Sequence, residues 1–186
     1  TDADARTALL PSEPMRVLLM GMMGSGKSSV GRALATLTGW PFFDNDVLVQ
    51  RATGRTAREL LETDGVDALR AAEATAFRAG LQIDPPAIVA IAAGVVLEPA
   101  DRSRMAEGGF TVWLRAHADV LAARSAGASH RPWLEGDAQA WFRDRLAERS
   151  PLYAEVADLE IDTSVTSPDE AASLIVSALP DTVPAR

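Results

Sequence analysis

The residues from Gly21 to Ser28 have the spacing of a loop that binds the phosphates of a nucleotide. They read GMMGSGKS and match the pattern G-x-x-x-x-G-K-[ST] at every defined position. In such a loop, backbone N–H groups point at phosphate oxygens, Lys27 reaches the β- and γ-phosphates, and the Ser28 hydroxyl ligates Mg²⁺. The alternative is a glycine-rich turn capped by Ser28, with Lys27 in solvent. We expect the nucleotide to be bound by Gly24, Ser25, Gly26, Lys27, Ser28 and Ser29.

Two carboxylates follow the next apolar run along the chain. Asp44 and Asp46 stand two residues apart, directly after Phe43. Ligands bind at the carboxyl ends of the strands in open α/β sheets, and residues two apart project to one side as long as strand geometry persists. The pair is therefore a candidate binding site for a ligand. The alternative is that the two acids only end a strand and begin a helix.

The elements that must position these groups are short apolar runs separated by segments of helical periodicity. This pattern is typical of a parallel sheet with crossover helices, so we predict an α/β fold with a five-stranded parallel sheet flanked by helices. A helix over residues 28–37 is expected directly after the phosphate loop. The strands are expected at residues 17–20, 42–43, 87–92, 111–114 and 159–161.

Several helix starts are marked by residues that cap helices. Thr56 is expected to cap a helix over residues 57–63, and Pro99 to begin another. Ser167 is expected to cap a third helix, with Glu170 placed for a capping box. Apolar positions then give two short helices a buried side, namely Leu60, Leu61, Leu69, Ala72 and Ala76.

The chain is expected to form a single domain over residues 15–179. Residues 1–14 and 180–186 are the only linker-like stretches, and we expect both to be flexible tails. The segment from Ala126 to Gly136 combines Gly, Ser, His and Pro with little periodicity. It is therefore predicted to be a long mobile loop, and loops of that length often act as lids.

The composition excludes several classes of protein. The chain has 186 residues, a net charge of −8, two His and no Cys. An acidic chain without a basic run is unsuited to a nucleic-acid backbone, and the apolar stretch from Pro85 to Leu97 is about half of the roughly 20 residues that a membrane span needs. The lack of Cys removes thiol chemistry, and two His make a zinc enzyme a poor fit. We expect a cytoplasmic monomer that binds neither nucleic acid nor membrane.

The order of motifs from Val17 to about Thr163 resembles shikimate kinase, a family of small P-loop kinases similar to the nucleoside monophosphate kinases. The phosphate loop is widespread among P-loop kinases, whereas an RPxL motif followed by RxPLY is much more specific. The resemblance implies a P-loop kinase fold with a lid, ATP and Mg²⁺ as cofactors, and a small-molecule carboxylate as substrate. It is carried by residues 21–32, 43–46 (FDND), 69–73 (LRAAE), 92–96 (AAGVV), 131–134 (RPWL) and 149–153 (RSPLY).

The resemblance also implies roles for residues around the transferred phosphate. Asp44 lies near Mg²⁺ together with Ser28, and Asp46 holds the hydroxyl that attacks the γ-phosphate. Arg131, at the head of the expected lid, folds over the nucleotide phosphates, where its charge can stabilise the transition state. Arg124 matches another arginine on the nucleotide side; for both arginines the alternative is a surface position. The catalytic residues implied are Lys27, Asp46 and Arg131.

On the acceptor side, Arg70 and Arg149 resemble two arginines that bind the substrate carboxylate. The planar guanidinium fork suits a carboxylate because it offers paired hydrogen bonds. Glu73 then helps to orient the arginine. The alternatives are that Arg70 only pairs with Glu73 or Asp67 on a solvated helix face, and that Arg149 is a cation near the C-terminal end of a helix.

The sequence departs from the family pattern on the acceptor side. Three consecutive glycines are usual after the third strand, and here they are replaced by Ala92-Ala93-Gly94. Ala93 and Gly94 are still expected to donate backbone N–H groups to the substrate. An alanine forced to a positive φ there would cost about 1–3 kcal/mol. Leu69 also replaces a usual aromatic residue, and Val66 replaces a common Glu.

The function that these observations favour is transfer of the γ-phosphate of ATP to the 3-hydroxyl of shikimate. One alternative is a related kinase for another small hydroxy acid or polyol such as gluconate, or for a nucleotide, because the two alanines leave room for a different pocket shape. Another is a nucleotide-binding switch that phosphorylates no small molecule. The joint presence of Asp46, Arg70 and Arg149 speaks against the switch, which would need no acceptor pocket.

Overall fold

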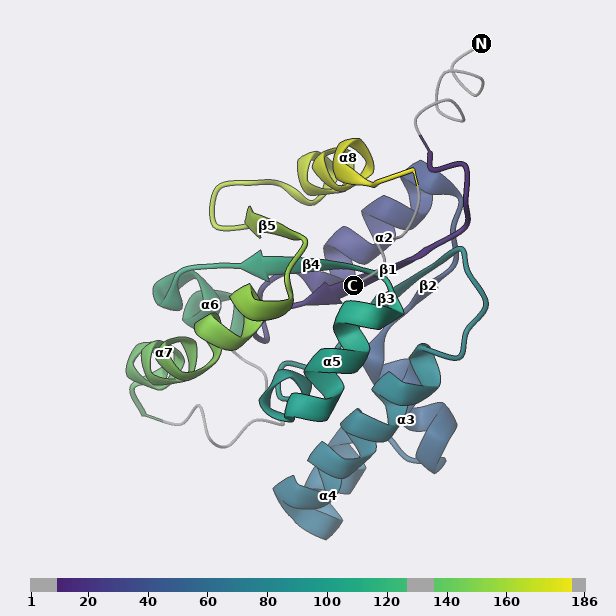
Figure 1. Ribbon diagram of the computed structural model, residues 1–186. Helices are drawn as coiled ribbons and strands as arrows, with labels where there is room; N and C mark the ends of the chain where they lie inside the picture. The colour runs from purple at the N-terminus through teal and green to yellow at the C-terminus, as the bar shows by residue number, and fades with distance from the viewer. Residues whose placement is uncertain (1–9, 127–135, 182–186) are drawn as a thin grey trace.

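The computed structural model describes residues 10–126 and 136–181, which form a five-stranded sheet covered by helices on both faces (Figure 1). All neighbouring strands are parallel, in the order β2-β3-β1-β4-β5. The predicted fold class is therefore confirmed. The strands are β1 (Arg16–Met20), β2 (Phe42–Phe43), β3 (Ala87–Ala90), β4 (Phe110–Arg115) and β5 (Leu159–Asp162).

Helices cover the two faces of the sheet in separate groups. One face carries α2 and α8, and the other carries α4, α5 and α7 (Figure 1). Because strand side chains alternate, Leu18 and Met20 of β1 pack into one apolar core, whereas Val17 and Leu19 pack into the other. The helices are α2 (Lys27–Thr38), α3 (Asn45–Thr53), α4 (Ala57–Gly80), α5 (Pro99–Gly108), α6 (Ala118–Ser125), α7 (Ala138–Val156) and α8 (Pro168–Ala178), with a 3₁₀ turn, η1, at Val95–Leu97.

The predicted helix starts are confirmed. Thr56 caps α4 through a capping box with Glu59, and Ser167 does the same for α8 with Glu170. Pro99 begins α5. The two short helices expected after Thr56 form one element, α4, which is interrupted at Gly65 by a backbone with φ 87° and ψ −180°. That left-handed φ is one that glycine adopts without strain, so the helix can change direction there.

Parts of the expected organisation lie outside the described residues. These are residues 1–9 and 182–186 of the expected tails, and residues 127–135 of the expected lid, including Arg131. The expected lid and the role of Arg131 therefore stay predictions. Within residues 10–126 and 136–181, no helix is both long and apolar enough to cross a membrane.

Candidate active site

The phosphate loop connects β1 to α2 at the carboxyl edge of the sheet. Gly21 must be glycine because a Cβ there would lie 2.2 Å from the carbonyl oxygen of Leu114 on the neighbouring strand β4. Gly26 precedes the first residue of α2 and has φ 93°, a left-handed conformation that glycine adopts without strain. The helix therefore begins at Lys27 with its free N–H groups at the loop, which is the geometry of an anion site.

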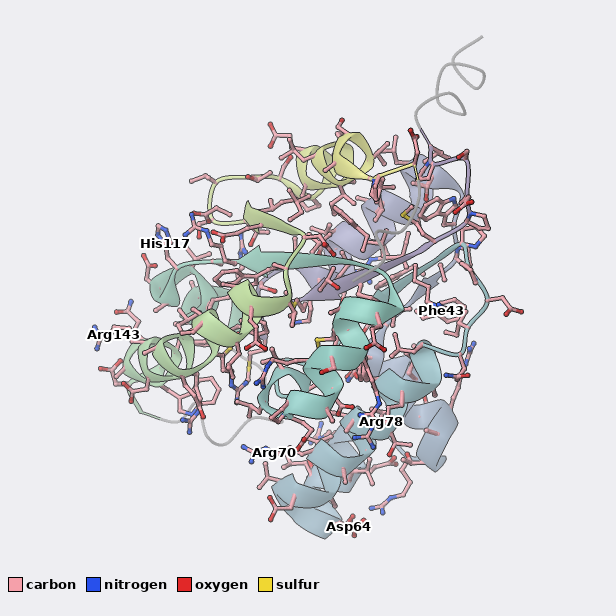
Figure 2. The ribbon with its side chains drawn as sticks, viewed as in Figure 1. Phe43, Asp64, Arg70, Arg78, His117 and Arg143 are labelled. Carbon is pink, nitrogen blue, oxygen red and sulfur yellow. The ribbon has the colours of Figure 1, made fainter. Side chains whose placement is uncertain are left out.

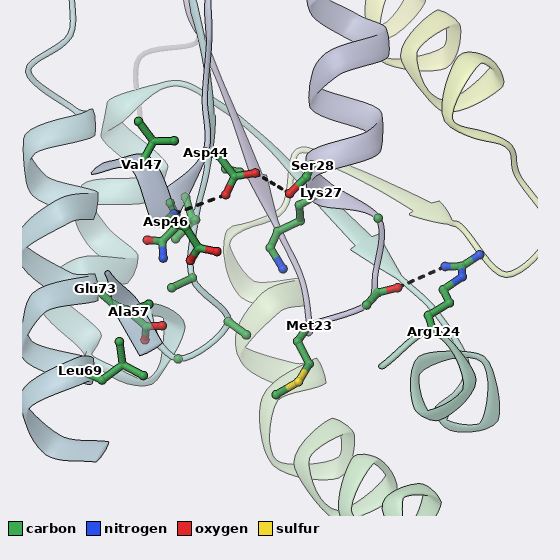
Figure 3. A pocket seen from close by; sticks show the side chains of 18 of the residues that line it. Met23, Lys27, Ser28, Asp44, Asp46, Val47, Ala57, Leu69, Glu73 and Arg124 are labelled. Atoms are coloured by element: carbon green, nitrogen blue, oxygen red, sulfur yellow. Dashed lines mark hydrogen bonds between the residues drawn. The ribbon is translucent and has the colours of Figure 1, made fainter. Parts of the chain in front are cut away.

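Lys27 lies against this loop and extends into the pocket (Figure 3). Its Nζ donates hydrogen bonds to the carbonyl oxygens of Gly21, at 2.8 Å, and Met22, at 2.9 Å. The side chain is half-buried. The ammonium is thus held over the loop and not in bulk solvent, within reach of any phosphate that the loop binds.

Asp44 and Asp46 lie beside the phosphate loop, but not as two residues of one strand. β2 ends at Phe43, so Asp44 is the N-cap of α3 and its Oδ1 accepts a 3.4 Å hydrogen bond from the backbone N–H of Asp46. Strand geometry therefore does not persist through the pair, and for the backbone the alternative holds: the acids end a strand and begin a helix. The carboxylate of Asp44 also accepts a hydrogen bond from the Ser28 hydroxyl (Figure 3). Asp44 therefore both caps α3 and contacts the nucleotide loop.

The Ser28 hydroxyl and the Asp44 carboxylate form a donor set that suits Mg²⁺. Both are oxygen ligands, and Mg²⁺ in kinases is bound by one or two carboxylates, with substrate phosphates and water completing the octahedron. No group of three or more His, Cys, Asp or Glu that could hold a metal occurs among the described residues. The residues present therefore fit a magnesium ion shared with a nucleotide and do not form a cage made by the protein alone.

On the acceptor side, α4 and α7 contribute groups to the same pocket as the phosphate loop. The pocket has a volume of about 1080 Å³ and is lined by Lys27, Asp46, Arg70, Glu73 and Arg149, among others. Arg70 is exposed at the surface of α4 (Figure 2), whereas Arg149 is only 7% exposed. α7 continues to Val156, so Arg149 lies within the helix and not at its C-terminal end, and that alternative is wrong.

The buried guanidinium of Arg149 is only partly paired. Its Nη1 donates to the carbonyl oxygen of Ala93 at 3.3 Å and contacts the sulfur of Met22 at 3.9 Å. Its Nε is buried without a hydrogen-bond partner in the part of the chain that the structure describes, and the Glu148 carboxylate is 3.9 Å away. A buried cation with unused donor capacity at a pocket wall is suited to an anionic ligand.

Glu73 lies in the pocket between groups of both charges. Burial and the carboxylate of Asp46 raise the pKa of Glu73 to about 7, and the cations Lys27, Arg149 and Arg70 oppose this shift. The net rise shows that desolvation and the like charge outweigh the three cations. Glu73 consequently changes its charge near neutral pH.

The alanines of the loop after β3 are not strained. Ala92 is buried and Ala93 half-buried, and no residue other than glycine has a positive φ within the described residues. Gly94 has φ −87° and ψ −15°, which any residue can adopt. The backbone strain that a positive φ would cause in Ala92 or Ala93 is therefore absent. The two alanines change the pocket only through their methyl groups.

Arg124 connects the nucleotide loop to the end of β5. Its guanidinium donates to the carbonyl oxygen of Gly24 at 3.3 Å (Figure 3) and to that of Thr163 at 2.6 Å. The hydroxyl of Thr163 in turn donates to the carbonyl oxygen of Ser25 at 2.9 Å. Sequence reasoning missed Thr163, although its place at the carboxyl end of a strand was a usable signal. Arg124 thus lies at the nucleotide side of the pocket.

Comparisons with known proteins show which family the chain resembles. The family model for shikimate kinase matches residues 23–180. A shikimate kinase from Mycobacterium avium is 37% identical over 168 residues, which cover 90% of this chain and 94% of the relative. One from Thermobifida fusca is 36% identical over 171 residues, covering 92% and 98%.

A solved structure gives the same result. Shikimate kinase from Acinetobacter baumannii, determined in complex with shikimate, superposes with a TM-score of 0.82 at 29% identity, covering 92% of this chain and 94% of the other. Likeness in sequence and in structure therefore extends over nearly the whole chain. The protein belongs to the shikimate kinase family, whose members are ATP-dependent kinases that phosphorylate an alcohol group.

Proposed function

We propose that the protein transfers the γ-phosphate of ATP to the 3-hydroxyl of shikimate. The observation that carries this proposal is the buried, partly unpaired Arg149 in the pocket that also contains Lys27 and Asp46. A guanidinium binds a carboxylate through two parallel hydrogen bonds, and Asp46 can accept a proton from a hydroxyl. An acceptor with both groups fits the pocket, and a related protein has been solved with shikimate.

The chemical step follows from the positions of these groups. The acceptor oxygen forms a bond to the γ-phosphorus while the bond from that phosphorus to the β,γ-bridging oxygen breaks, so ADP leaves. The hydroxyl proton goes to Asp46, which orients the attacking oxygen. Lys27 balances charge on the β- and γ-phosphates, and most of the rate gain comes from positioning and electrostatic stabilisation.

Further residues complete the proposal on both sides of the transferred phosphate. Ser28 and Asp44 would hold Mg²⁺, which when bound neutralises charge on the phosphate oxygens. The loop residues from Gly24 to Ser29 and Arg124 bind the nucleotide, and Arg131 closes over its phosphates. Arg70 and Arg149 bind the acceptor carboxylate, with the backbone of Ala93 and Gly94 beside the ring.

The proposal is tested by ADP release with MgATP and a panel of acceptors. Shikimate, quinate, gluconate and nucleoside monophosphates are compared at equal concentrations. We expect turnover with shikimate, and a product whose added phosphate is on the 3-oxygen by phosphorus NMR. Turnover only with another acceptor refutes shikimate as the substrate, and ATP binding without any turnover would favour a nucleotide-binding switch.

The proposal also covers the oligomeric state of the enzyme and its location in the cell. We propose that the enzyme is a monomer in the cytoplasm, where ATP is available. The cytoplasm is reducing, and a chain without Cys has no disulfides that this environment could break. Light scattering at assay concentration should give a mass near 19.7 kDa.

A further inference from the structure

The carbonyl group of Ala93 accepts hydrogen bonds from two side chains of α7. The hydroxyl of Tyr153 donates to this oxygen at 2.8 Å, and Nη1 of Arg149 donates to it at 3.3 Å. The two donors are four residues apart and lie on one face of the helix, one turn from each other. Two side chains of α7 therefore bind the same oxygen atom of the loop after β3.

Tyr153 is well placed to hold that oxygen in a fixed position. Its side chain is 1% exposed, and its ring stacks on Trp113 of β4 with centroids 5.7 Å apart and planes at 26°. Burial raises the pKa of Tyr153, so the hydroxyl stays protonated as a donor. The sulfur of Met22 lies 3.9 Å from the hydroxyl, but the single hydrogen of the phenol goes to the much closer carbonyl oxygen.

Arg149 depends on the same oxygen for its orientation. Among the described residues its hydrogen bonds come from Nη1 alone, to Ala93 and to the weak acceptor sulfur of Met22. The carboxylate of Glu148, at 3.9 Å from Nε, is too far away for a hydrogen bond. The guanidinium of Arg149 is thus oriented by the Ala93 carbonyl, which Tyr153 also holds, and by its direct interaction with the Tyr153 hydroxyl.

We propose that Tyr153 is a positioning residue for the acceptor: its hydroxyl fixes the Ala93 carbonyl and so aims the guanidinium of Arg149 at the acceptor carboxylate. This inference rests on the proposed function, because it takes the ligand of Arg149 to be the substrate. Tyr153 touches neither substrate nor nucleotide in this scheme. Its loss should therefore weaken acceptor binding and leave the ATP side unchanged.

The decisive variant is Tyr153→Phe, which keeps the ring and its stacking on Trp113 and removes only the hydroxyl. We expect KM for shikimate to rise about tenfold, the change that corresponds to loss of one hydrogen bond. KM for ATP should stay within about twofold, because the phosphate loop keeps its contacts. A merely structural role predicts a lower melting temperature without this split between the two KM values.

Thr111→Val is the matched control. Thr111 is fully buried in β4, and its hydroxyl donates to the carbonyl oxygen of Met105 at 3.3 Å, outside the pocket. This variant also removes a buried hydroxyl that serves a backbone carbonyl. We expect both variants to melt at lower temperature than the wild type, and only Tyr153→Phe to raise KM for shikimate.

A double-mutant cycle tests whether Tyr153 acts through Arg149. In an Arg149→Lys background the guanidinium fork is absent, so adding Tyr153→Phe should change KM for shikimate by less than about twofold. Equal effects in both backgrounds, or an unchanged KM in the single variant, overturn the inference. If the wild type phosphorylates another hydroxy acid instead of shikimate, the proposed function fails by itself, and the same comparison is made with that acceptor. If no acceptor is phosphorylated, both fail.

Discussion

The hydroxyl of Ser28 donates a hydrogen bond to the carboxylate of Asp44, which joins the first turn of α2 to the N-cap of α3. The phosphate loop and the end of β2 are thereby in direct contact, although 16 residues separate the two groups in sequence. Two oxygen ligands from different elements are in this way brought to one point beside the nucleotide loop.

Asp44→Asn should weaken magnesium binding, and so raise the magnesium concentration that activity requires, while leaving the fold intact. Asn keeps an oxygen that can accept from Ser28 and cap α3, and it loses the negative charge that attracts the cation. We expect the Mg²⁺ concentration for half-maximal activity to rise about tenfold, as measured by ADP release. Asp144→Asn, at an exposed position on α7, is the control. Equal magnesium dependence in all three proteins contradicts the assignment.

Lys27→Met should remove catalysis without unfolding the protein. The ammonium is the charge nearest to the phosphate loop, and losing one preorganised electrostatic partner of a transition state costs about 10²–10³ in kcat. Arg32→Met, an exposed cation further along α2, should leave kcat unchanged. Circular dichroism and thermal melting check that both variants are folded. An unchanged kcat in Lys27→Met refutes the role of this residue.

Arg149→Ala should raise KM for the acceptor with little effect on ATP. A charge-assisted hydrogen-bond pair to a carboxylate is lost, so we expect an increase of about 100-fold. The matched control is Arg143→Ala, on the outer side of the same helix (Figure 2). Initial rates over a grid of both substrates separate the two KM values. An increase confined to KM for ATP would move Arg149 to the nucleotide side.

Stability should fall as pH rises toward neutrality because of Glu73. Its pKa is raised from an ordinary value of 4.5 to about 7 in the folded protein, so between these values the native state holds a proton that the unfolded chain releases. The free energy of unfolding should therefore decrease by about 1–3 kcal/mol as pH goes from 4.5 to 8. Urea titrations of wild type, Glu73→Gln and the exposed-site control Glu107→Gln measure it. Glu73→Gln alone should lack this part of the decrease.

Replacing the two alanines of the acceptor loop by glycine should bring no gain. Ala92 and Ala93 already have ordinary backbone angles, so Ala92→Gly and Ala93→Gly release no strain and instead give the unfolded chain more freedom. We expect each to lower the free energy of unfolding by about 0.5–1 kcal/mol, with KM for shikimate no better than in wild type. A clear fall in KM would mean that the methyl groups obstruct the substrate.

Local patterns in the sequence were sufficient to predict much of the fold. The strand, glycine and helix signals around Lys27 all lie within about twenty residues, and so do the capping boxes of α4 and α8. Even the two-residue strand β2 was predicted, because Phe42 and Phe43 form one of the short apolar runs. Where short-range interactions determine the structure, the prediction is confirmed.

Contacts between distant segments could not be predicted in the same way. Ala93 lies 56 residues before Arg149 and 60 before Tyr153, and their hydrogen bonds depend on how α7 is rotated about its axis. For Asp44 and Asp46 the sequence left two arrangements open, because the choice depends on the residue at which β2 stops. Thr163 contacts Ser25 because the strand order brings the end of β5 close to the phosphate loop, and hydrophobic periodicity does not specify the strand order.

The strand order has a consequence for how new substrates could evolve. With β1 in the centre, the segments after β2 and β3 form the acceptor wall, and those after β4 and β5 lie with Arg124 at the nucleotide. Mutations that select a different acceptor should accumulate between residues 46 and 94, and Asp44 should be kept because it lies with Ser28 on the nucleotide side. Arg149 is the exception among the described site residues, because it reaches the acceptor from beyond β4. A lineage that abandons carboxylate substrates should lose it first.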